Sequence, residues 1–261
     1  KVPAPQKCLD LSYPASDNIA LQECIERIVM LVENSRNPII IADICTTRHS
    51  ICKALKNLLN QTGILFATRG MGKGVINESH PQYVGIYNGN FSSNGVQELV
   101  ETSDCVISFG SLLSDLNTGG FTAKLKASST IEINSNHVIV KYSKYDNLYL
   151  NDVIVALTKS LKSRNFNDKK IEVLRTDIKQ FRPAQNIPIT HAYLWQYMSQ
   201  FWQKDHIIIA ETGSALFGSL QLKLPDNAIY ICQLLWASIG YTVGALLGSA
   251  IADIQRRSIL L

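Results

Sequence analysis

The sequence predicts an α/β protein made of two units, each built from parallel strands that alternate with helices. Short apolar runs alternate with longer segments whose apolar residues recur at helical spacing, which is typical of βαβ units and a mostly parallel sheet. The alternation stops in a polar, charged stretch over 163–189 and then starts again. Of the 261 residues, 46% are hydrophobic and 18% are charged. This composition is that of an ordinary globular protein, which excludes a disordered or fibrous chain.

The first unit is expected over residues 1–162. Apolar residues at 21, 25, 28, 29 and 32 predict a helix over 19–33, with Ser16 or Asp17 as its cap. The run at 39–42 predicts a strand that is buried on both faces. Further helices are expected at 49–61 (ending before Gly63), 95–101 and 153–161, and further strands at 64–67, 105–109, 130–133 and 138–140.

The second unit is expected over residues 190–261, after a linker at 163–189 that includes a short helix over 173–178. Its helices are expected at 191–202 and 238–252, and its strands at 206–210, 228–232 and 257–261. The sequence starts in a linker-like stretch and stops inside an apolar run. We therefore expect it to be a piece of a longer protein.

Charge and cysteine spacing exclude several classes of function. The net charge of +4 arises from 25 basic and 21 acidic residues, which are interspersed rather than clustered, so a dedicated nucleic-acid surface is not expected. The six cysteines form no CxxC pair and the five histidines are scattered, which argues against a structural zinc site and a disulfide framework. We expect reduced thiols in a cytoplasmic protein.

Two glycine-containing segments have more than one interpretation. Residues 70–74 (Gly-Met-Gly-Lys-Gly) are similar to a phosphate-binding loop, but the P-loop spacing is absent and no helix follows, so a tight turn at a strand end is favoured. Residues 228–252 carry no formal charge, and Gly240, Gly244 and Gly248 are four apart. That pattern is found in membrane helices, and the alternative is a helix buried in an α/β core.

Polar residues follow several of the expected strands. Asp43 and Asp115 come after strands of the first unit, and 211–214 (Glu-Thr-Gly-Ser) follow the strand at 206–210. Ligands bind at the carboxyl edge of parallel sheets, so these residues are candidates for ligand contacts. For 211–214 a capped helix start is an equally simple alternative, and for Asp43 and Asp115 solvated or capping carboxylates are favoured.

Several motifs occur together in an order that identifies a family. They are 38–43 (Pro-Ile-Ile-Ile-Ala-Asp), 48–49 (Arg-His), 71–74 (Met-Gly-Lys-Gly), 85–89 (Gly-Ile-Tyr-Asn-Gly), 113–119 (Leu-Ser-Asp-Leu-Asn-Thr-Gly), 210–213 (Ala-Glu-Thr-Gly) and 233–241 (Gln-Leu-Leu-Trp-Ala-Ser-Ile-Gly-Tyr). Together they resemble thiamine-diphosphate-dependent 2-oxo acid decarboxylases of the pyruvate and indolepyruvate decarboxylase group. The resemblance covers almost the whole chain apart from the linker. It implies that 1–162 are a Rossmann-like middle domain and that 190–261 are the start of a truncated diphosphate-binding domain.

The resemblance also implies an activity. The expected reaction is non-oxidative decarboxylation of a 2-oxo acid, with pyruvate favoured, to an aldehyde and CO2 with thiamine diphosphate and Mg. The implied state is a cytoplasmic homodimer or homotetramer without a nucleic-acid or membrane partner. No catalytic residue is implied within 1–261, and the metal ligands are expected after Leu261, so we do not expect residues 1–261 alone to be active.

The family's site residues carry over to a few positions here. The implied cofactor-binding residues are Thr212, Ser214, Ala237, Ser238 and Ile239, and the implied substrate-pocket residues are Thr212 and Leu216. Ile239 matches an aliphatic side chain that separates the two rings of the cofactor. The carbonyl of Ala237 and the N–H of Ile239 match groups that bind the pyrimidine, although Gly is the common residue at 237.

Cys45 matches a cysteine implicated in substrate activation. Nothing in the local sequence lowers the pKa of its thiol, so a bystander role is favoured.

The resemblance leaves alternatives open. Thr212 is similar to the pyruvate enzymes, whereas 85–89 is similar to the bacterial indolepyruvate type, so the 2-oxo acid is not fixed. A carboligating relative such as an acetolactate synthase, which usually binds a flavin, is one alternative. A non-catalytic nucleotide-binding module is another, although the GxGxxG motif is absent. A short, non-catalytic interaction protein is the third.

Overall fold

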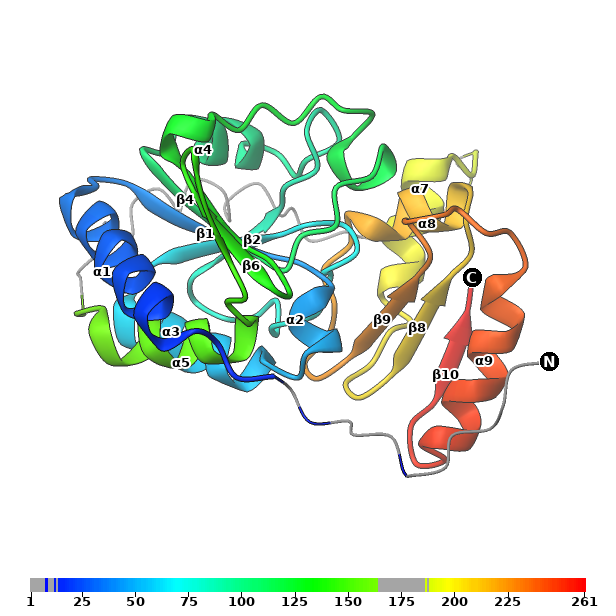
Figure 1. The fold of residues 1–261 in the computed structure, drawn as a ribbon. Helices are drawn as coiled ribbons and strands as arrows, with labels where there is room; N and C mark the ends of the chain where they lie inside the picture. The colour runs from blue at the N-terminus through cyan, green and yellow to red at the C-terminus, as the bar shows by residue number, and fades with distance from the viewer. Residues whose placement is uncertain (1–7, 9–11, 13, 164–185, 187) are drawn as a thin grey trace.

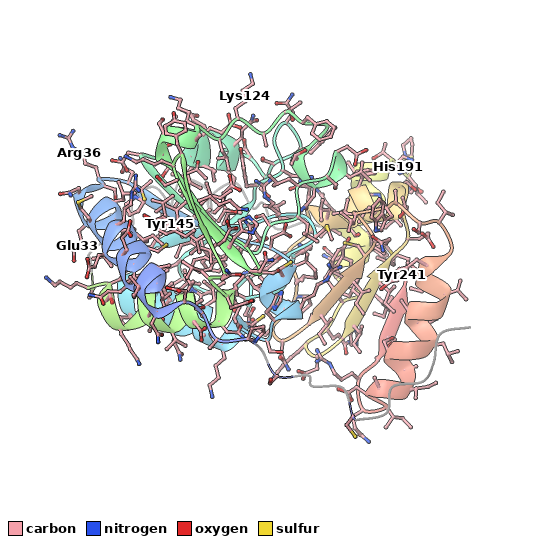
Figure 2. All side chains as sticks on the ribbon, in the orientation of Figure 1. Glu33, Arg36, Lys124, Tyr145, His191 and Tyr241 are labelled. Atoms are coloured by element: carbon pink, nitrogen blue, oxygen red, sulfur yellow. The ribbon has the colours of Figure 1, made fainter. Side chains whose placement is uncertain are left out.

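Two β-sheets organise the chain in the computed structural model, which describes residues 8, 12, 14–163, 186 and 188–261 (Figure 1). One sheet has seven strands in the order β3-β2-β1-β4-β5-β6-β7, and the other has three in the order β10-β8-β9. We call residues 14–163 the large-sheet region and residues 188–261 the small-sheet region. In Figure 2, Glu33 is labelled in the large-sheet region and Tyr241 in the small-sheet region.

The large sheet is mostly parallel, as the sequence predicts. Its parallel strands are β1 (Pro38–Ala42), β2 (Leu65–Thr68), β3 (Tyr83–Ile86), β4 (Cys105–Phe109) and β5 (Thr130–Ile133), and β6 (His137–Val140) and β7 (Ser143–Asp146) continue it antiparallel. β1 is central, with Ile40 paired to Phe66 on one side and to Ile107 on the other.

Helices cover both faces of the large sheet (Figure 1). The helices α1 (Asn18–Asn34), α3 (Cys52–Thr62) and α5 (Leu150–Ser160) pack on the face that holds Ile40 and Phe66. The short helix α4 (Val96–Glu101) packs on the face that holds Ile39 and Ile41. Because alternate residues of β1 enter different cores, the strand is buried on both faces, and that prediction is confirmed.

Helix ends confirm some predictions and correct others. The side chain of Asp17 caps α1 by accepting a hydrogen bond from the Ala20 amide, and Gly63 ends α3 in the left-handed conformation. The helix expected at 49–61 starts only at Cys52, because 45–48 form a separate short helix, α2 (Cys45–Arg48), and Ser50 has a φ of 56°. The helix expected at 153–161 begins earlier, at 150.

The small sheet is entirely parallel. The order along the chain is α7 (His191–Ser199), β8 (Ile207–Ala210), α8 (Ser214–Leu220), β9 (Ile229–Cys232), α9 (Tyr241–Ala252) and β10 (Ser258–Leu260). The helix expected at 238–252 starts at 241, because the preceding residues form a turn, and the helix expected at 191–202 ends at 199. The helix expected at 173–178 lies outside the described residues.

A hydrophobic cluster joins the two regions. Met71 and Ile86 of the large-sheet region pack with Leu220, Tyr230 and Leu234 of the small-sheet region. The carboxyl edge of the large sheet is therefore covered by the small-sheet region. Within the described part of the chain, no helix has the length and apolar character needed to cross a membrane, and the uncharged stretch 228–252 forms β9, a turn and α9 instead.

Candidate functional site

The clearest candidate site is an open pocket of about 490 Å³ at the carboxyl edge of the small sheet. Parallel pairing places the ends of β8, β9 and β10 at this one edge. The pocket is lined by residues that follow β8, by the first turn of α9 and by the end of β10: Glu211, Thr212, Gly213, Ser214, Ala215, Thr242, Val243, Leu260 and Leu261. No lysine or arginine is among these lining residues.

Thr212 and Gly213 are the two lining residues that point to a bound ligand. The hydroxyl oxygen of Thr212 is buried and has no hydrogen-bond partner, which is a costly state for a protein polar group. Gly213 has a φ of 141°, and no atom lies within 4 Å of the place where a side chain would begin. The backbone is therefore open on this side, and a ligand with hydrogen-bonding oxygens can reach it.

Glu211 connects the pocket to the segment before α9. One carboxylate oxygen accepts a hydrogen bond from the Thr212 amide at 2.7 Å. The other accepts from the Gly240 amide at 3.0 Å and from the Thr242 hydroxyl at 2.5 Å. These donors, the Thr242 hydroxyl first, lower the pKa of Glu211, so the side chain is a carboxylate at neutral pH.

A turn over 233–240 leads into α9. The side chain of Gln233 accepts hydrogen bonds from the amides of Leu235 and Trp236 and so shapes its start. Ala237 lies in the left-handed region with a φ of 48°, which is unfavourable for a residue with a β-carbon. This conformation favours Gly, which is the residue that the family resemblance implies at this position. Ile239 presents its side chain to solvent, with 82% of it exposed.

The structure brings some of the predicted site residues together. Thr212 and Ser214 line the pocket, and Ala237, Ser238 and Ile239 lie on the turn that Glu211 links to it. Leu216 lies on α8, fully buried in the hydrophobic cluster between the regions, and it does not line this pocket. Its substrate-pocket role stays a prediction without a supporting contact here.

A second ligand location exists in principle in the large-sheet region. The strand order reverses between β1 and β4, and in doubly wound folds ligands bind in the crevice at such a point. Here Asp43 fills it: its carboxylate accepts hydrogen bonds from the amides of Ile44 at 2.8 Å and Leu112 at 3.0 Å, and from the side chain of Asn117 at 2.7 Å. Burial raises the pKa of Asp43 to about 6.

The surroundings of Asp43 are equally occupied. The buried guanidinium of Arg69 donates to the Asn117 carbonyl and lies over the ring of Tyr87. A side chain at Gly110 would begin 2.6 Å from Cys45. The Asp43 carboxylate and the close packing at Gly110 therefore occupy the space that a nucleotide phosphate would need. This arrangement argues against the nucleotide-binding alternative. Asp115 caps a short 3-10 helix, consistent with the capping interpretation.

Cys45 has the environment of a structural thiol. Its side chain is buried, and burial raises the pKa of the thiol. A raised pKa keeps the sulfur protonated and unreactive at neutral pH. These observations favour the bystander interpretation of Cys45, and its regulatory role stays a prediction.

The glycine-rich loop at 70–74 joins the two regions instead of forming a phosphate cradle. Two of its amides are used inside the turn, with Gly72 donating to the Arg69 carbonyl and Lys73 to the Gly70 carbonyl, and the Met71 amide donates to the side chain of Asn117. Gly72 packs on the end of β1, where a β-carbon would lie 2.6 Å from the Ala42 carbonyl oxygen. The turn interpretation is confirmed, and the glycines are explained by close packing.

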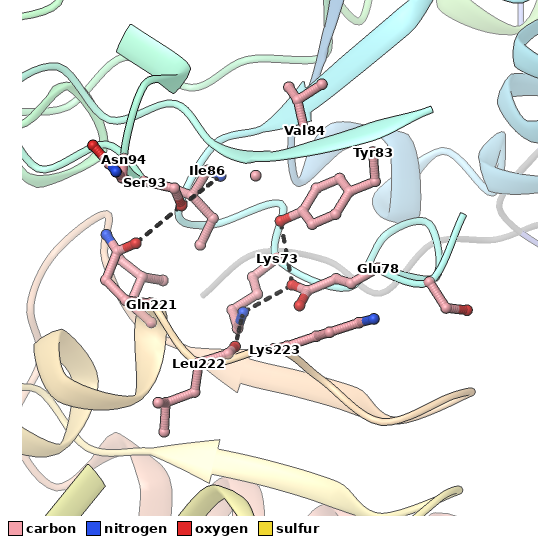
Figure 3. Close-up of a pocket in the computed structure, with 13 residues that line it drawn as sticks. Lys73, Glu78, Tyr83, Val84, Ile86, Ser93, Asn94, Gln221, Leu222 and Lys223 are labelled. Carbon is pink, nitrogen blue, oxygen red and sulfur yellow. Dashed lines mark hydrogen bonds and ion pairs between the residues drawn. The ribbon is translucent and has the colours of Figure 1, made fainter. Parts of the chain in front are cut away.

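Lys73 is the polar centre of this junction (Figure 3). Its ammonium pairs with Glu78 at 2.8 Å, and both side chains are 2% exposed. It also donates to the carbonyl of Leu222 at 2.7 Å, and Glu78 accepts from the amide of Leu224 at 2.8 Å. A buried ion pair of the large-sheet region therefore satisfies backbone groups of the small-sheet region.

A cavity of about 470 Å³ lies beside this ion pair (Figure 3). On its other side, Ser93 donates to the side chain of Gln221, another contact between the two regions. The cavity belongs to the junction, and the two buried charged side chains that line it, Lys73 and Glu78, are already paired with each other. Across the described residues, no group of three or more His, Cys, Asp or Glu side chains is arranged to hold a metal ion.

Comparison with known proteins finds similarity along nearly the whole chain. Residues 25–149 match the family described as "Thiamine pyrophosphate enzyme, central domain". The chain is 36% identical to a pyruvate decarboxylase of Candida albicans, over 97% of this chain and 46% of that protein. It is 36% identical to pyruvate decarboxylase isozyme 3 of Saccharomyces cerevisiae, over 98% of this chain and 46% of that protein. It is 34% identical to a pyruvate decarboxylase of Aspergillus fumigatus, over 97% of this chain and 45% of that protein. The chain thus spans about half the length of these relatives.

Proposed function

Because this chain belongs to the thiamine pyrophosphate enzymes and is similar along nearly its whole length to pyruvate decarboxylases, we propose that the full-length protein decarboxylates a 2-oxo acid without oxidation. The products are an aldehyde and CO2, and the cofactors are thiamine diphosphate and Mg. Pyruvate is the proposed substrate, supported by the names of the relatives and by Thr at position 212.

One observation carries the proposal. The residues that the family resemblance links to the cofactor lie at one edge of the small sheet, next to a pocket that contains an unsatisfied buried hydroxyl. Leaving the buried Thr212 oxygen without a partner costs about 1–3 kcal/mol. Because this oxygen is inaccessible in the structure, a group bound in the pocket removes the cost when the Thr212 side chain rotates toward it.

The pocket fits one end of thiamine diphosphate. Thr212 and Ser214 offer hydroxyl groups, and the open backbone at Gly213 lets phosphate oxygens approach closely. The lining residues include the carboxylate of Glu211 and no basic side chain, so a diphosphate here needs a cation to balance its charge. This requirement supports Mg as the second cofactor, since Mg commonly binds together with substrate phosphates.

The turn at 237–240 fits the other end of the cofactor. The exposed side chain of Ile239 is free to pack against an aromatic ring, and the backbone of Ala237 lies on the same turn. When bound, thiamine diphosphate supplies a nucleophilic carbon and an electron sink for the bond that breaks. The part of this chain is to hold the cofactor in one conformation through Thr212, Ser214 and Ile239.

The large-sheet region has a supporting part in this proposal. Its ligand crevice is filled by Asp43, and its glycine-rich loop holds the small-sheet region through Lys73. We assign residues 1–162 to a middle domain, 163–189 to a linker and 190–261 to the first part of the diphosphate-binding domain. The protein is proposed to work in the cytoplasm, in keeping with its free cysteines, as a homodimer or homotetramer.

The proposal is tested by an aldehyde assay on the full-length protein. With pyruvate, thiamine diphosphate and Mg, added alcohol dehydrogenase and NADH should report continuous acetaldehyde formation, and omission of thiamine diphosphate should abolish it. Residues 1–261 alone should form no aldehyde. Full-length protein that forms no aldehyde from pyruvate or any other 2-oxo acid would overturn the proposal. Bound flavin and acetolactate as the product would favour the carboligating alternative.

A further inference from the structure

Glu211 is the residue that joins the two parts of the candidate site. Its own amide donates to the carbonyl of Leu261 at 3.0 Å, so its backbone is fixed by the neighbouring strand β10. Its carboxylate then reaches in two directions. One oxygen holds the Thr212 amide, and the other holds the Gly240 amide and the Thr242 hydroxyl. One side chain therefore links the end of β8 to residues 29 and 31 positions later.

The ionised form of Glu211 is required for all three hydrogen bonds. The donors are two N–H groups and one hydroxyl, and only a carboxylate accepts on both oxygens without offering a proton. Hydrogen bonds to a charged acceptor are stronger than neutral ones. The amide side chain of glutamine has the same size but one acceptor oxygen, so its NH2 group would face an N–H or hydroxyl donor. The geometry thus distinguishes Glu from Gln at this position.

The turn that Glu211 holds has little other support from packing. Ser238, Ile239 and Gly240 are exposed. Ala237 has an unfavourable backbone conformation that surrounding contacts have to maintain. Thr242, by contrast, is only 2% exposed, so its hydroxyl is fixed where Glu211 can accept from it. The carboxylate and Thr242 are therefore the anchor of an otherwise exposed segment.

We propose that Glu211 is a positioning residue, which sets the distance between the hydroxyl-lined pocket at Thr212 and Ser214 and the turn at 237–239. The inference rests on the proposed function, which assigns these two parts to opposite ends of one thiamine diphosphate molecule. Glu211 itself does not need to touch the cofactor. It acts through Thr212 on one side and through Gly240 and Thr242 on the other.

The test uses four variants of the full-length protein. Glu211→Gln removes one acceptor, Thr242→Val removes the hydroxyl at nearly constant volume, and Thr242→Ser restores a hydroxyl. Glu33→Gln is the matched control, because Glu33 is exposed on α1 at the far end of the large-sheet region (Figure 2). For each variant we would measure the Kd of thiamine diphosphate at saturating Mg by tryptophan fluorescence. Steady-state kinetics at saturating cofactor would then give kcat and KM for pyruvate.

The expected result is a rise of about tenfold or more in the cofactor Kd for Glu211→Gln and Thr242→Val, as for a lost hydrogen bond to a charged group. Thr242→Ser should recover most of the affinity, and Glu33→Gln should match the parent protein. In Glu211→Gln, kcat should fall at saturating cofactor while KM for pyruvate changes little. Backbone amides of 237–242 should exchange hydrogen faster in Glu211→Gln without cofactor, which tests the anchor even if binding is too weak to measure.

Three results would contradict the inference, and they are distinguishable. If the parent protein binds thiamine diphosphate and forms aldehyde while Glu211→Gln and Thr242→Val do the same with unchanged Kd and kcat, the positioning role is wrong and the proposed function stands. Equal losses in Thr242→Ser and Thr242→Val would also overturn the positioning role. If the parent protein neither binds the cofactor nor forms aldehyde, both the function and the inference fail.

Discussion

The two regions of the molecule differ in how fully their helices are buried. In the large-sheet region, α1 and α3 each bury an apolar stripe, and residues such as Ile28 and Leu55 are completely inaccessible to solvent. In the small-sheet region, α9 is apolar on nearly every side, yet Thr242 is its one fully buried residue and Leu247 and Ile251 are 64% and 75% exposed. A helix that is hydrophobic all round is normally buried all round.

In this chain, the region that is packed most completely is not the region that holds the open pocket. The large-sheet region is packed on both faces, and its ligand crevice is filled by Asp43. The small-sheet region keeps an open pocket at the carboxyl edge of its sheet, beside the unsatisfied hydroxyl of Thr212 and the left-handed Ala237. Unsatisfied buried atoms and positive-φ residues also occur in the large-sheet region, for example at Asn88 and Phe121, so the open pocket is what distinguishes the two regions.

The largest effect is expected at the junction between the regions. Lys73→Ala leaves the carboxylate of Glu78 buried without its partner, which should lower the free energy of unfolding by about 3–5 kcal/mol. The matched control is Lys144→Ala, because Lys144 and Asp146 form a pair of similar length in which both side chains are more than half exposed. That change should cost about 1 kcal/mol or less. Urea denaturation of both variants checks the difference, and similar losses would contradict a buried junction.

Core substitutions in the two regions sharpen the contrast. Ile40→Ala removes a fully buried side chain from the central strand and should cost about 2–5 kcal/mol. Ile251→Ala removes an exposed side chain from α9 and should change the stability of residues 1–261 by about 0.5 kcal/mol or less. Chemical denaturation of the two variants gives both numbers. A large loss from Ile251→Ala would mean that α9 is packed more fully than described.

The carboxylates of the two regions should respond to pH in opposite directions. The pKa of Asp43 is raised from 3.8 to about 6, so the folded state holds its proton more tightly than the unfolded state. Its contribution to stability is greatest below pH 3.8 and falls by about 3 kcal/mol as the pH rises to about 6. The pKa of Glu211 is lowered, so its contribution is lost as the pH falls through that lowered pKa.

The pH prediction is checked by denaturation between pH 4 and pH 7. Asp43→Asn is neutral throughout this range, so it is expected to lose the decline between pH 4 and pH 6. A decline of the same size in Asp43→Asn would assign it to another group.

The smallest effect is expected at the turn before α9. Ala237→Gly removes the β-carbon from a residue with a φ of 48° and should raise stability by about 1 kcal/mol. The control is Ala245→Gly within α9, where glycine should lower stability by roughly 0.5–1 kcal/mol. Thermal denaturation measures both shifts. A loss of stability in both variants would show that the left-handed conformation of Ala237 is not present in solution.

Most of the fold follows from local patterns. The central strand at 38–42 and the stop at Gly63 depend on neighbouring residues alone, and both are predicted. The strands β3 and β7 are not predicted. β3 contains Gly85 in a positive-φ conformation, and β7 lies at the sheet edge with alternate side chains exposed. Neither has the continuous apolar run that marks a central strand.

The candidate site is predicted only in part, because its organisation depends on contacts between distant residues. Thr212 and Ser214 follow a strand and are found by that pattern together with the family resemblance. The role of Glu211 depends on an amide 29 residues away, and the role of Lys73 depends on a carbonyl 149 residues away. Such pairings leave no pattern in the neighbouring residues. The sequence therefore shows Glu211 only as part of a motif and Lys73 only as part of a glycine-rich loop, and it predicts neither role.

The most direct test of this account is hydrogen exchange of the full-length protein, measured by mass spectrometry with and without thiamine diphosphate and Mg. We expect slower exchange at 211–214 and 237–242 when the cofactor is added, and unchanged exchange at 43–46 and 110–117, where Asp43 already fills the crevice. Protection at 43–46 and 110–117 without protection at 211–214 and 237–242 would contradict it.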